Sequence, residues 1–250
     1  GSDIYLQKKP EIEKNVKQFL KRVDFLISDC ERDYTLAREL GFTSKFLGVF
    51  PGNGGVNFLV DKILPAAHRR TIVIKGYDDG VGKALVVIRA LENIKRSLLE
   101  PLDIVVYGAD EKVVTYVNNS IFFSKLNIQI FPRHSFVLNE EILALKGKSS
   151  IYIGNSISDG LPNSLIEAMG MGAFPIQSNP GDASAEIIRP GENGFLISNT
   201  GDANHIAELI EKALLDFDMR KKAQAENTGL IGMKYSRSEL KQKIINLYYS

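Results

Sequence analysis

The 250-residue sequence is poor in residues that form disulfides or bind transition metals, with one cysteine, Cys30, and three histidines. A single cysteine cannot form a disulfide within the chain, and sparse cysteine is typical of reducing compartments. The histidines are not spaced as zinc ligands, so no metal site is expected. No apolar run is long enough to cross a bilayer, and no secretory signal is recognisable. These absences predict a cytoplasmic protein without a transmembrane segment.

Neither sign of charge is in excess. Lysine and arginine together number 31, and aspartate and glutamate 30, which gives a formal net charge of +1. This balance argues neither for nor against an anionic ligand, and no nucleic-acid partner is predicted. Hydrophobic residues make up 44% of the chain and charged residues 24%, as in ordinary soluble globular proteins. The length allows one large domain or two small ones.

Apolar strand patterns alternate with helical patterns from residue 71 onward. This alternation predicts βαβ units and a doubly wound, Rossmann-like parallel sheet, whose ligand lies at the carboxyl ends of the strands. Strands are expected at 71–75, 102–107, 127–131, 150–153, 173–177 and 194–197. Helices are expected near 81–97, 110–125, 139–146, 163–171, 202–215, 217–227 and 237–248. Before this region, residues 10–50 predict a shorter helix–strand–helix–strand segment.

The glycine-rich turn after the strand at 71–75 does not fit either common nucleotide fingerprint. Gly76 and Gly82 enclose five residues, whereas a P-loop has four, and Ala84 stands where a hydroxyl should bind magnesium. No G-x-G-x-x-G pattern follows any expected strand, which argues against a dinucleotide enzyme. Asp78-Asp79-Gly is more typical of a turn than of a metal pair.

Residues 151–171 predict a strand, a polar loop and a helix. Pro162 suits the first turn of that helix, where its missing amide costs nothing. The amides of Asn163 and Ser164 then lie unbonded at the positive end of the helix dipole, a feature that binds anions. Asp159 on the loop and Glu167 on the helix can border one cleft. The alternative is a helix-capping aspartate and a solvated glutamate.

This stretch resembles the donor-sugar signature of the group 1 family of retaining GT-B glycosyltransferases. One departure is Asp159, where the family usually has glutamate, so the carboxylate reaches one methylene less far. The matching residues are Asp159-Gly160, Leu161-Pro162, Glu167-Ala168-Met169, Gly172, Phe174-Pro175-Ile176, Gly181, Glu186 and Gly191-Glu192-Asn193-Gly194.

The resemblance implies a hexosyltransferase that moves a sugar from a nucleoside diphosphate to a hydroxyl acceptor with retention of configuration. It assigns Glu167 to the ribose hydroxyls. Lys75 and Lys83 occupy positions comparable to those of the Arg and Lys with which the family binds the diphosphate. Here Lys replaces the Arg, and the two residues are farther apart in the sequence than in the family. The implied donor-binding residues are Lys75, Gly160, Leu161, Pro162, Asn163, Ser164, Glu167 and His134, with Asp159 and Lys83 in catalytic roles. No metal and no cofactor besides the nucleotide sugar are expected.

By the same resemblance, residues 59–250 are the donor-binding C-terminal domain, residues 3–58 a remnant of the acceptor-side N-terminal domain with its linker, and residues 1–2 a tag scar. The rest of the N-terminal domain would be missing, so the fragment is expected to be inactive alone. The implied acceptor is a glycan or lipid-linked glycan in polysaccharide biosynthesis, in the cytoplasm or at the inner face of the membrane.

Two other functions remain open from the sequence. A sugar-nucleotide epimerase shares the fold, although its further catalytic carboxylates and histidine find no counterpart here. A non-catalytic nucleotide- or partner-binding module is the second alternative, and a module that binds only a partner would bind no nucleoside diphosphate.

Overall fold

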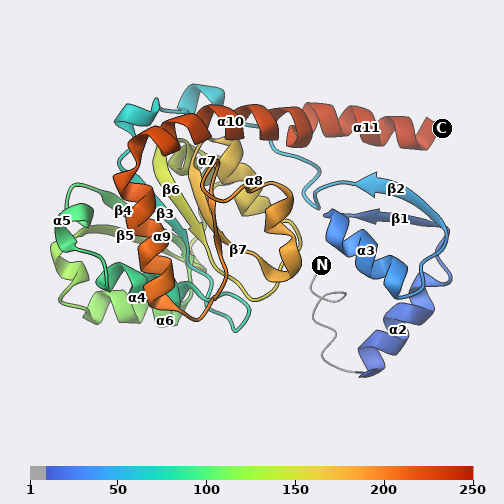
Figure 1. Cartoon of the computed structure of the whole chain (residues 1–250), viewed down its shortest axis with the longest axis horizontal. Coiled ribbons are helices and arrows are strands. Elements are labelled where there is room, and N and C mark those ends of the chain that lie inside the picture. Colours follow the sequence, from blue (N-terminus) through green and yellow to red (C-terminus); the bar gives the residue numbers. More distant parts are fainter. Residues whose placement is uncertain (1–9, 250) are drawn as a thin grey trace.

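A six-stranded parallel sheet forms the centre of the computed structural model, which describes residues 10–249 (Figure 1). The strand order is β5-β4-β3-β6-β7-β8, and each neighbouring pair is parallel. The strands are β3 (Thr71–Lys75), β4 (Asp103–Ala109), β5 (Asn127–Pro132), β6 (Ser149–Gly154), β7 (Phe174–Ser178) and β8 (Phe195–Ile197). The predicted parallel sheet is confirmed, whereas the predicted tag scar at 1–2 lies outside the described residues.

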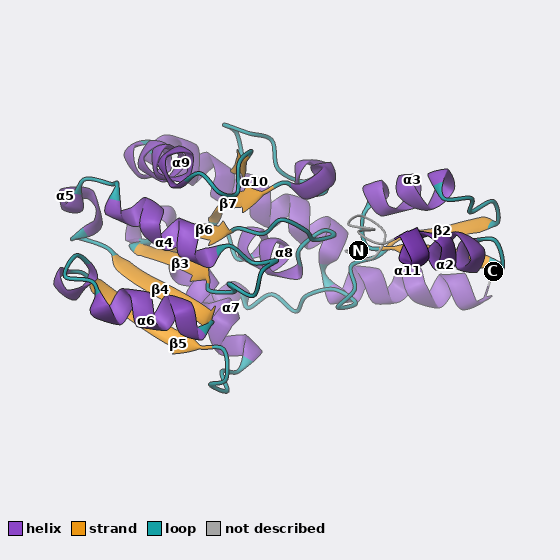
Figure 2. Cartoon of the chain, turned by 90° about the horizontal axis from the view of Figure 1, so that it is seen from below, coloured by secondary structure: helices purple, strands orange, loops and turns teal. Residues whose placement is uncertain are grey.

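Helices cover both faces of this sheet (Figure 2). On one face α4, α6 and α9 pack against Ile72 and Ile74, and on the other α7 and α8 pack beside Val73 and Tyr152. This burial of both faces explains why the strands read as continuous apolar runs. The helices are α4 (Ala84–Glu92), α5 (Arg96–Leu99), α6 (Glu111–Asn119), α7 (Asn139–Lys148), α8 (Asn163–Gly170), α9 (Ala203–Leu215), α10 (Phe217–Tyr235) and α11 (Arg237–Tyr249), with short 3₁₀ turns at Val60–Lys62, Ala66–His68, Phe123–Lys125, Pro180–Asp182 and Ser184–Glu186.

The strand order reverses between β3 and β6. Strands β4 and β5 extend the sheet on one side of β3, and β7 and β8 extend it on the other side of β6. The loops that leave the carboxyl ends of β3 and β6 therefore diverge to opposite faces and leave a crevice between them. Lys75 ends β3, and the loop 155–162 follows β6.

Residues 10–49 form a smaller unit at one end of the molecule. Its strands β1 (Phe25–Ser28) and β2 (Lys45–Val49) pair in parallel, and α2 (Pro10–Leu20) and α3 (Glu31–Glu39) accompany them. Tyr34 stacks on Phe46 with ring centroids 3.7 Å apart. The buried core of this unit is Leu20, Ala37, Leu40 and Phe42, whereas Phe25 and Ile27 are 58% and 49% exposed.

The smaller unit is attached to the larger one through the first turn of α3. Both carboxylate oxygens of Glu186 accept hydrogen bonds from the amides of Glu31 and Arg32, each at 3.0 Å. The guanidinium of Arg32 donates to the carbonyl oxygen of Pro180 at 2.7 Å. The carboxylate of Glu186 in the larger unit thus caps the N-terminus of α3. The N-cap residue of this helix, Cys30, makes no capping hydrogen bond with its own side chain.

The connector between the two units lies beside the junction of α10 with α11, and α11 extends towards the end of the molecule that holds the smaller unit (Figure 1). The connector after β2 and the junction of α10 with α11 pair through an isolated bridge between Val56 and Ser236. The amide of Val56 donates to Tyr235 and the amide of Arg237 to Val56, both at 3.0 Å. Within residues 10–249, no helix is both long and apolar enough to cross a bilayer.

Three predicted helices differ from the structure by several residues. The helix predicted at 110–125 ends as α6 at Asn119, and Phe123–Lys125 form a separate 3₁₀ turn. The helix predicted at 81–97 begins only at Ala84, because Gly82 instead bridges to Ser156, and it ends at Glu92 before α5 starts. α10 continues to Tyr235, beyond the predicted end at 227, because it packs along α8 and no proline interrupts it.

The α3 cap predicts a local effect of Glu186→Ala. Loss of a helix cap costs about 0.5–2 kcal/mol, so the amides of α3 should exchange faster with solvent while those of the six-stranded sheet keep their protection. Hydrogen exchange followed by mass spectrometry checks this. The control is Glu192→Ala, since Glu192 is 59% exposed and pairs only locally with Arg189. Equal exchange of α3 in both variants would contradict the role of Glu186.

Candidate functional site

The crevice between β3 and β6 contains two cavities, of about 210 and about 410 Å³. Lys75, Tyr77 and Asp159 line both, so the cavities adjoin. The smaller one extends along the loop after β6, and the larger one extends along α8 to Glu167. This is the place that the strand order predicts for a ligand.

Lys75 and Asp159 provide the charges shared by the two cavities. Burial lowers the pKa of Lys75, and the charge of Asp159 acts in the opposite direction. Burial likewise raises the pKa of Asp159, with Lys75 opposing. The ammonium of Lys75 lies 4.8 Å from the ring centroid of Tyr77. Each group is therefore held in surroundings that disfavour its charge, and an anionic ligand would stabilise the lysine.

The first turn of α8 borders the larger cavity. Pro162 precedes the helix with φ −65°, and its carbonyl oxygen accepts from the amides of Leu165 and Ile166 at 3.0 and 3.1 Å. The amides of Asn163 and Ser164 make no hydrogen bond with any described residue, and both residues line the cavity. The positive end of this helix is thus open to a ligand in the cavity.

Glu167 is anchored from behind by a residue that the sequence did not reveal. Its carboxylate forms an ion pair with the ammonium of Lys146 on α7. The side chain of Lys146 is fully buried, while that of Glu167 is 14% exposed and lines the larger cavity. Removing one member of such a buried pair typically costs about 3–5 kcal/mol, since the other charge is left uncompensated. Glu167 is therefore not the solvated glutamate of the alternative interpretation.

Three buried hydroxyl groups lie beside this ion pair, on Tyr107, Tyr152 and Ser164. They lie close enough to one another to affect the pKa of both tyrosines, but none makes a hydrogen bond of regular geometry with a described residue. Burial raises the pKa of both tyrosines, so the phenols remain protonated. Tyr107 and Ser164 belong to the lining of the larger cavity. Buried polar groups normally find partners, so this side of the cavity has unused hydrogen-bonding capacity.

The glycine-rich loop after β3 is held by carboxylates. The amide of Asp78 donates to Asp110 at 2.7 Å, and that of Gly82 donates to Asp79 at 3.0 Å. Arg133 bonds to Asp79 at 2.9 Å and to Asp110 at 3.3 Å. The hydrogen bond from Gly82, followed by Arg133, lowers the pKa of Asp79. These amides are used within the protein, which agrees with the rejection of a P-loop.

Arg133, rather than His134, faces the larger cavity after β5. Its guanidinium lies 4.1 Å from the ring centroid of Tyr77, and Arg133 and Ser135 both line the cavity. His134 is exposed and lines neither cavity. The side chains that this edge presents to the cavity are thus those of Arg133 and Ser135, and a contact of His134 with a ligand stays a prediction.

Four other predicted residues lie at the border of the cavities. Lys83 directly follows Gly82, a lining residue, and its amide donates to the carbonyl oxygen of Asn155 at 2.9 Å. Leu161 and Pro162 are buried, and Gly160 lies against Asp29. The structure thus brings together Lys75, Asp159, Asn163, Ser164 and Glu167, whereas Lys83, His134 and Gly160–Pro162 do not line the cavities.

The sequence did not identify Tyr77 and Tyr107, which line the cavities, or Lys146, which lies buried behind Glu167. Tyr107 is paired in register with Lys75, so it could have been found once β3 and β4 were known to be neighbours. Lys146 carries no signal of its own, because it reads as one more lysine near a helix end.

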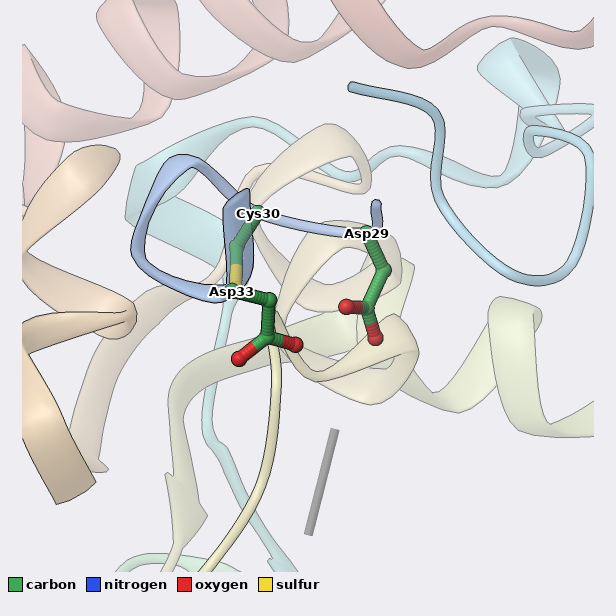
Figure 3. Close-up of side chains that lie close together, drawn as sticks. All are labelled: Asp29, Cys30 and Asp33. Carbon is green, nitrogen blue, oxygen red and sulfur yellow. The ribbon is translucent and has the colours of Figure 1, made fainter. Parts of the chain in front are cut away.

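Asp29, Cys30 and Asp33 cluster at the start of α3 (Figure 3), with one potential ligand atom from each within 4.8 Å of the others. Asp33 pairs with Arg32 at 2.6 Å. Burial raises the pKa of Cys30 to about 12, so its thiol stays protonated. Burial raises the pKa of Asp29, and so does the hydrogen bond that its protonated carboxyl donates to Asp33. These contacts make the cluster part of the junction with Gly160 rather than a metal centre.

A larger depression, of about 700 Å³, lies beside α6, between Glu92 and Tyr116. The phenol of Tyr116 donates to Glu92 at 2.6 Å. No carboxyl end of a strand contributes to its lining, and its charged residues, Glu92, Glu111 and Lys112, belong to α4 and α6.

Several solved structures share this fold, among them a sucrose-phosphate synthase and a glycosyltransferase from Rickettsia africae. The Anabaena protein HepE, in complex with UDP and glucose, superposes with a TM-score of 0.75 at 14% identity, over 99% of this chain and 69% of its own. Sucrose-phosphate synthase from Thermosynechococcus elongatus gives 0.75 at 16%, over 98% and 62%. A variant of TarM from S. aureus, in complex with Fondaparinux, alpha-GlcNAc-glycerol and UDP, gives 0.69 at 15%, over 96% and 47%.

The TM-scores show a shared fold, that of GT-B glycosyltransferases, as predicted, and at such low sequence identity they show the fold alone. No curated protein sequence matches the chain. The sequence profile of the family described as Glycosyl transferases group 1 matches residues 68–229, from the start of the six-stranded sheet into α10. Since this match spans well over half of the 250 residues, the chain belongs to the group 1 glycosyl transferases.

Proposed function

We propose that this chain is the nucleotide-sugar-binding part of a retaining glycosyltransferase. The observation that carries the proposal is the crevice of a group 1 family member, which joins Lys75, Asp159, Glu167 and the open first turn of α8. Residues 59–250 would be the donor domain and residues 3–58 part of an acceptor-side domain. Because the structures of HepE and of the TarM variant are complexes with UDP, UDP is the first nucleotide to test.

The charges of the crevice suit the departure of a diphosphate. Negative charge develops on the leaving group, and preorganised cations and amides stabilise it most in a site from which water is excluded. Lys75 and the amides of Asn163 and Ser164 would bind this diphosphate, with Lys83 as a second cation from the border of the smaller cavity. Asp159 would bind the donor sugar, and Glu167 the ribose hydroxyls.

The acceptor, a glycan or lipid-linked glycan in this proposal, would bind between the donor domain and a more complete N-terminal domain. The groups that activate its hydroxyl are assigned to that domain. We therefore infer that residues 1–250 bind a donor and transfer its sugar slowly at most.

A titration with UDP, GDP and ADP, followed by calorimetry, tests this function. We expect one of the three to bind, and the corresponding nucleotide sugars to bind without appreciable transfer. If none of the three nucleotides binds, a non-catalytic partner-binding module is favoured. Conversion of a bound nucleotide sugar to its epimer, detected by NMR, would favour the epimerase.

The two lysines should act on the phosphates and not on the nucleoside. We expect Lys75→Ala and Lys83→Ala each to weaken nucleoside diphosphate binding about tenfold, the equivalent of roughly 1.4 kcal/mol, and to leave nucleoside binding unchanged. Added salt should weaken diphosphate binding less in the variants than in the wild type. Lys95→Ala, at an exposed position beyond the far end of α4, is the control. Equal losses for nucleoside and diphosphate would assign these lysines to folding instead.

The depressed pKa of Lys75 predicts a pH dependence. Its ammonium loses its proton at lower pH than the ordinary value of 10.5, because burial disfavours the charge. Diphosphate binding should therefore weaken as the pH rises towards that value, since the cation becomes neutral. Lys75→Arg retains its charge in this range, so calorimetric titrations at increasing pH should show a flatter dependence for this variant. An identical pH profile for both proteins would exclude Lys75 as the titrating group.

A further inference from the structure

Lys146 is a buried cation that no step of the proposed reaction uses. It lies near the end of α7 with a fully buried side chain, while Lys148 in the same helix is exposed. Lysine is almost never fully buried unless it is paired, because removing an ammonium from water is costly. Its position therefore calls for a partner, and the structure provides Glu167.

The ion pair uses one side of the Glu167 carboxylate. The Oε2 atom bonds to the ammonium of Lys146. The Oε1 atom makes no hydrogen bond to any residue in the described range 10–249, and Glu167 lines the larger cavity. One oxygen is thus fixed from behind, and the other remains available to a ligand.

The surroundings make this fixation specific. The ammonium of Lys146 lies 5.3 Å from the ring centroid of Tyr107 and 5.6 Å from that of Tyr152. Aromatic faces attract a cation, and their low polarity strengthens its attraction to the carboxylate. The pair therefore restricts Glu167 to one orientation.

We propose that Lys146 is a positioning residue, which holds Glu167 so that its free oxygen accepts a hydrogen bond from a ribose hydroxyl of the donor. The inference rests on the proposed function, in which Glu167 binds the ribose. Lys146 itself touches no ligand in this arrangement. Its contribution is to prevent the carboxylate from rotating away or bonding elsewhere before the nucleotide arrives.

The experiment compares Lys146→Met with Lys146→Met/Glu167→Gln. Methionine fills a similar volume among the aromatic rings, and Glu167 can then turn to water in the cavity, so the single variant should fold. The double variant removes both charges and leaves no unpaired lysine. The ligands are UDP, GDP or ADP, whichever binds the wild type, and its 2′,3′-dideoxy analogue. Lys148→Met is the matched control on the same helix.

We expect Lys146→Met to bind the nucleoside diphosphate about tenfold more weakly than the wild type and the dideoxy analogue equally well, with no further loss in the double variant. Equal weakening of both ligands in Lys146→Met would overturn the proposal, because Lys146 would then support only the fold. Wild-type affinity of Lys146→Met beside a weakened double variant would also overturn it, and would leave the proposed role of Glu167 intact. Wild-type affinity in the double variant would refute that role itself.

Discussion

The reversal of strand order between β3 and β6 is the constraint on which the site depends. Because all six strands are parallel, every connection must cross over a face of the sheet, and crossovers on opposite faces diverge only at this point. The sheet places the end of β3, with Lys75, beside the loop that carries Asp159. α8 then begins where its unpaired amides point towards the same space. The site residues are therefore assembled by topology, although they are distant in the sequence.

The crevice contains charges of both signs, which are held in place before any ligand arrives. Lys75 and Asp159 influence each other's pKa across the shared wall of the two cavities, and Lys146 fixes Glu167 from within the protein. Preorganisation of this kind matters because groups that are already oriented and desolvated need no further rearrangement during a reaction. The chain is thus nearly neutral in net charge, although its crevice contains strong opposite charges close together.

The sequence predicted the sheet well because each strand is a short apolar run between polar turns. The strand at 71–75 agrees with β3 residue for residue, and α8 is one residue shorter than predicted. Predictions from local sequence patterns failed where a contact between distant segments determines a helix boundary or the role of a side chain. Gly82 pairs with Ser156, so α4 begins later than predicted. The role of Lys146 depends on the packing of α8 beside α7, which the sequence of α7 alone does not indicate. Arg133 rather than His134 lines the cavity for the same reason, because its guanidinium contacts Tyr77 and two aspartates from other segments of the chain.

The first turn of α3 brings the smaller unit to the border of the crevice. The hydrogen bonds of this turn to Glu186 and Pro180 hold it there, and Cys30 is buried in one cluster with Leu161 and Leu165. Asp29 consequently lies against Gly160, the residue that follows Asp159. A displacement of the smaller unit would therefore change the surroundings of the loop to which we assign the donor sugar.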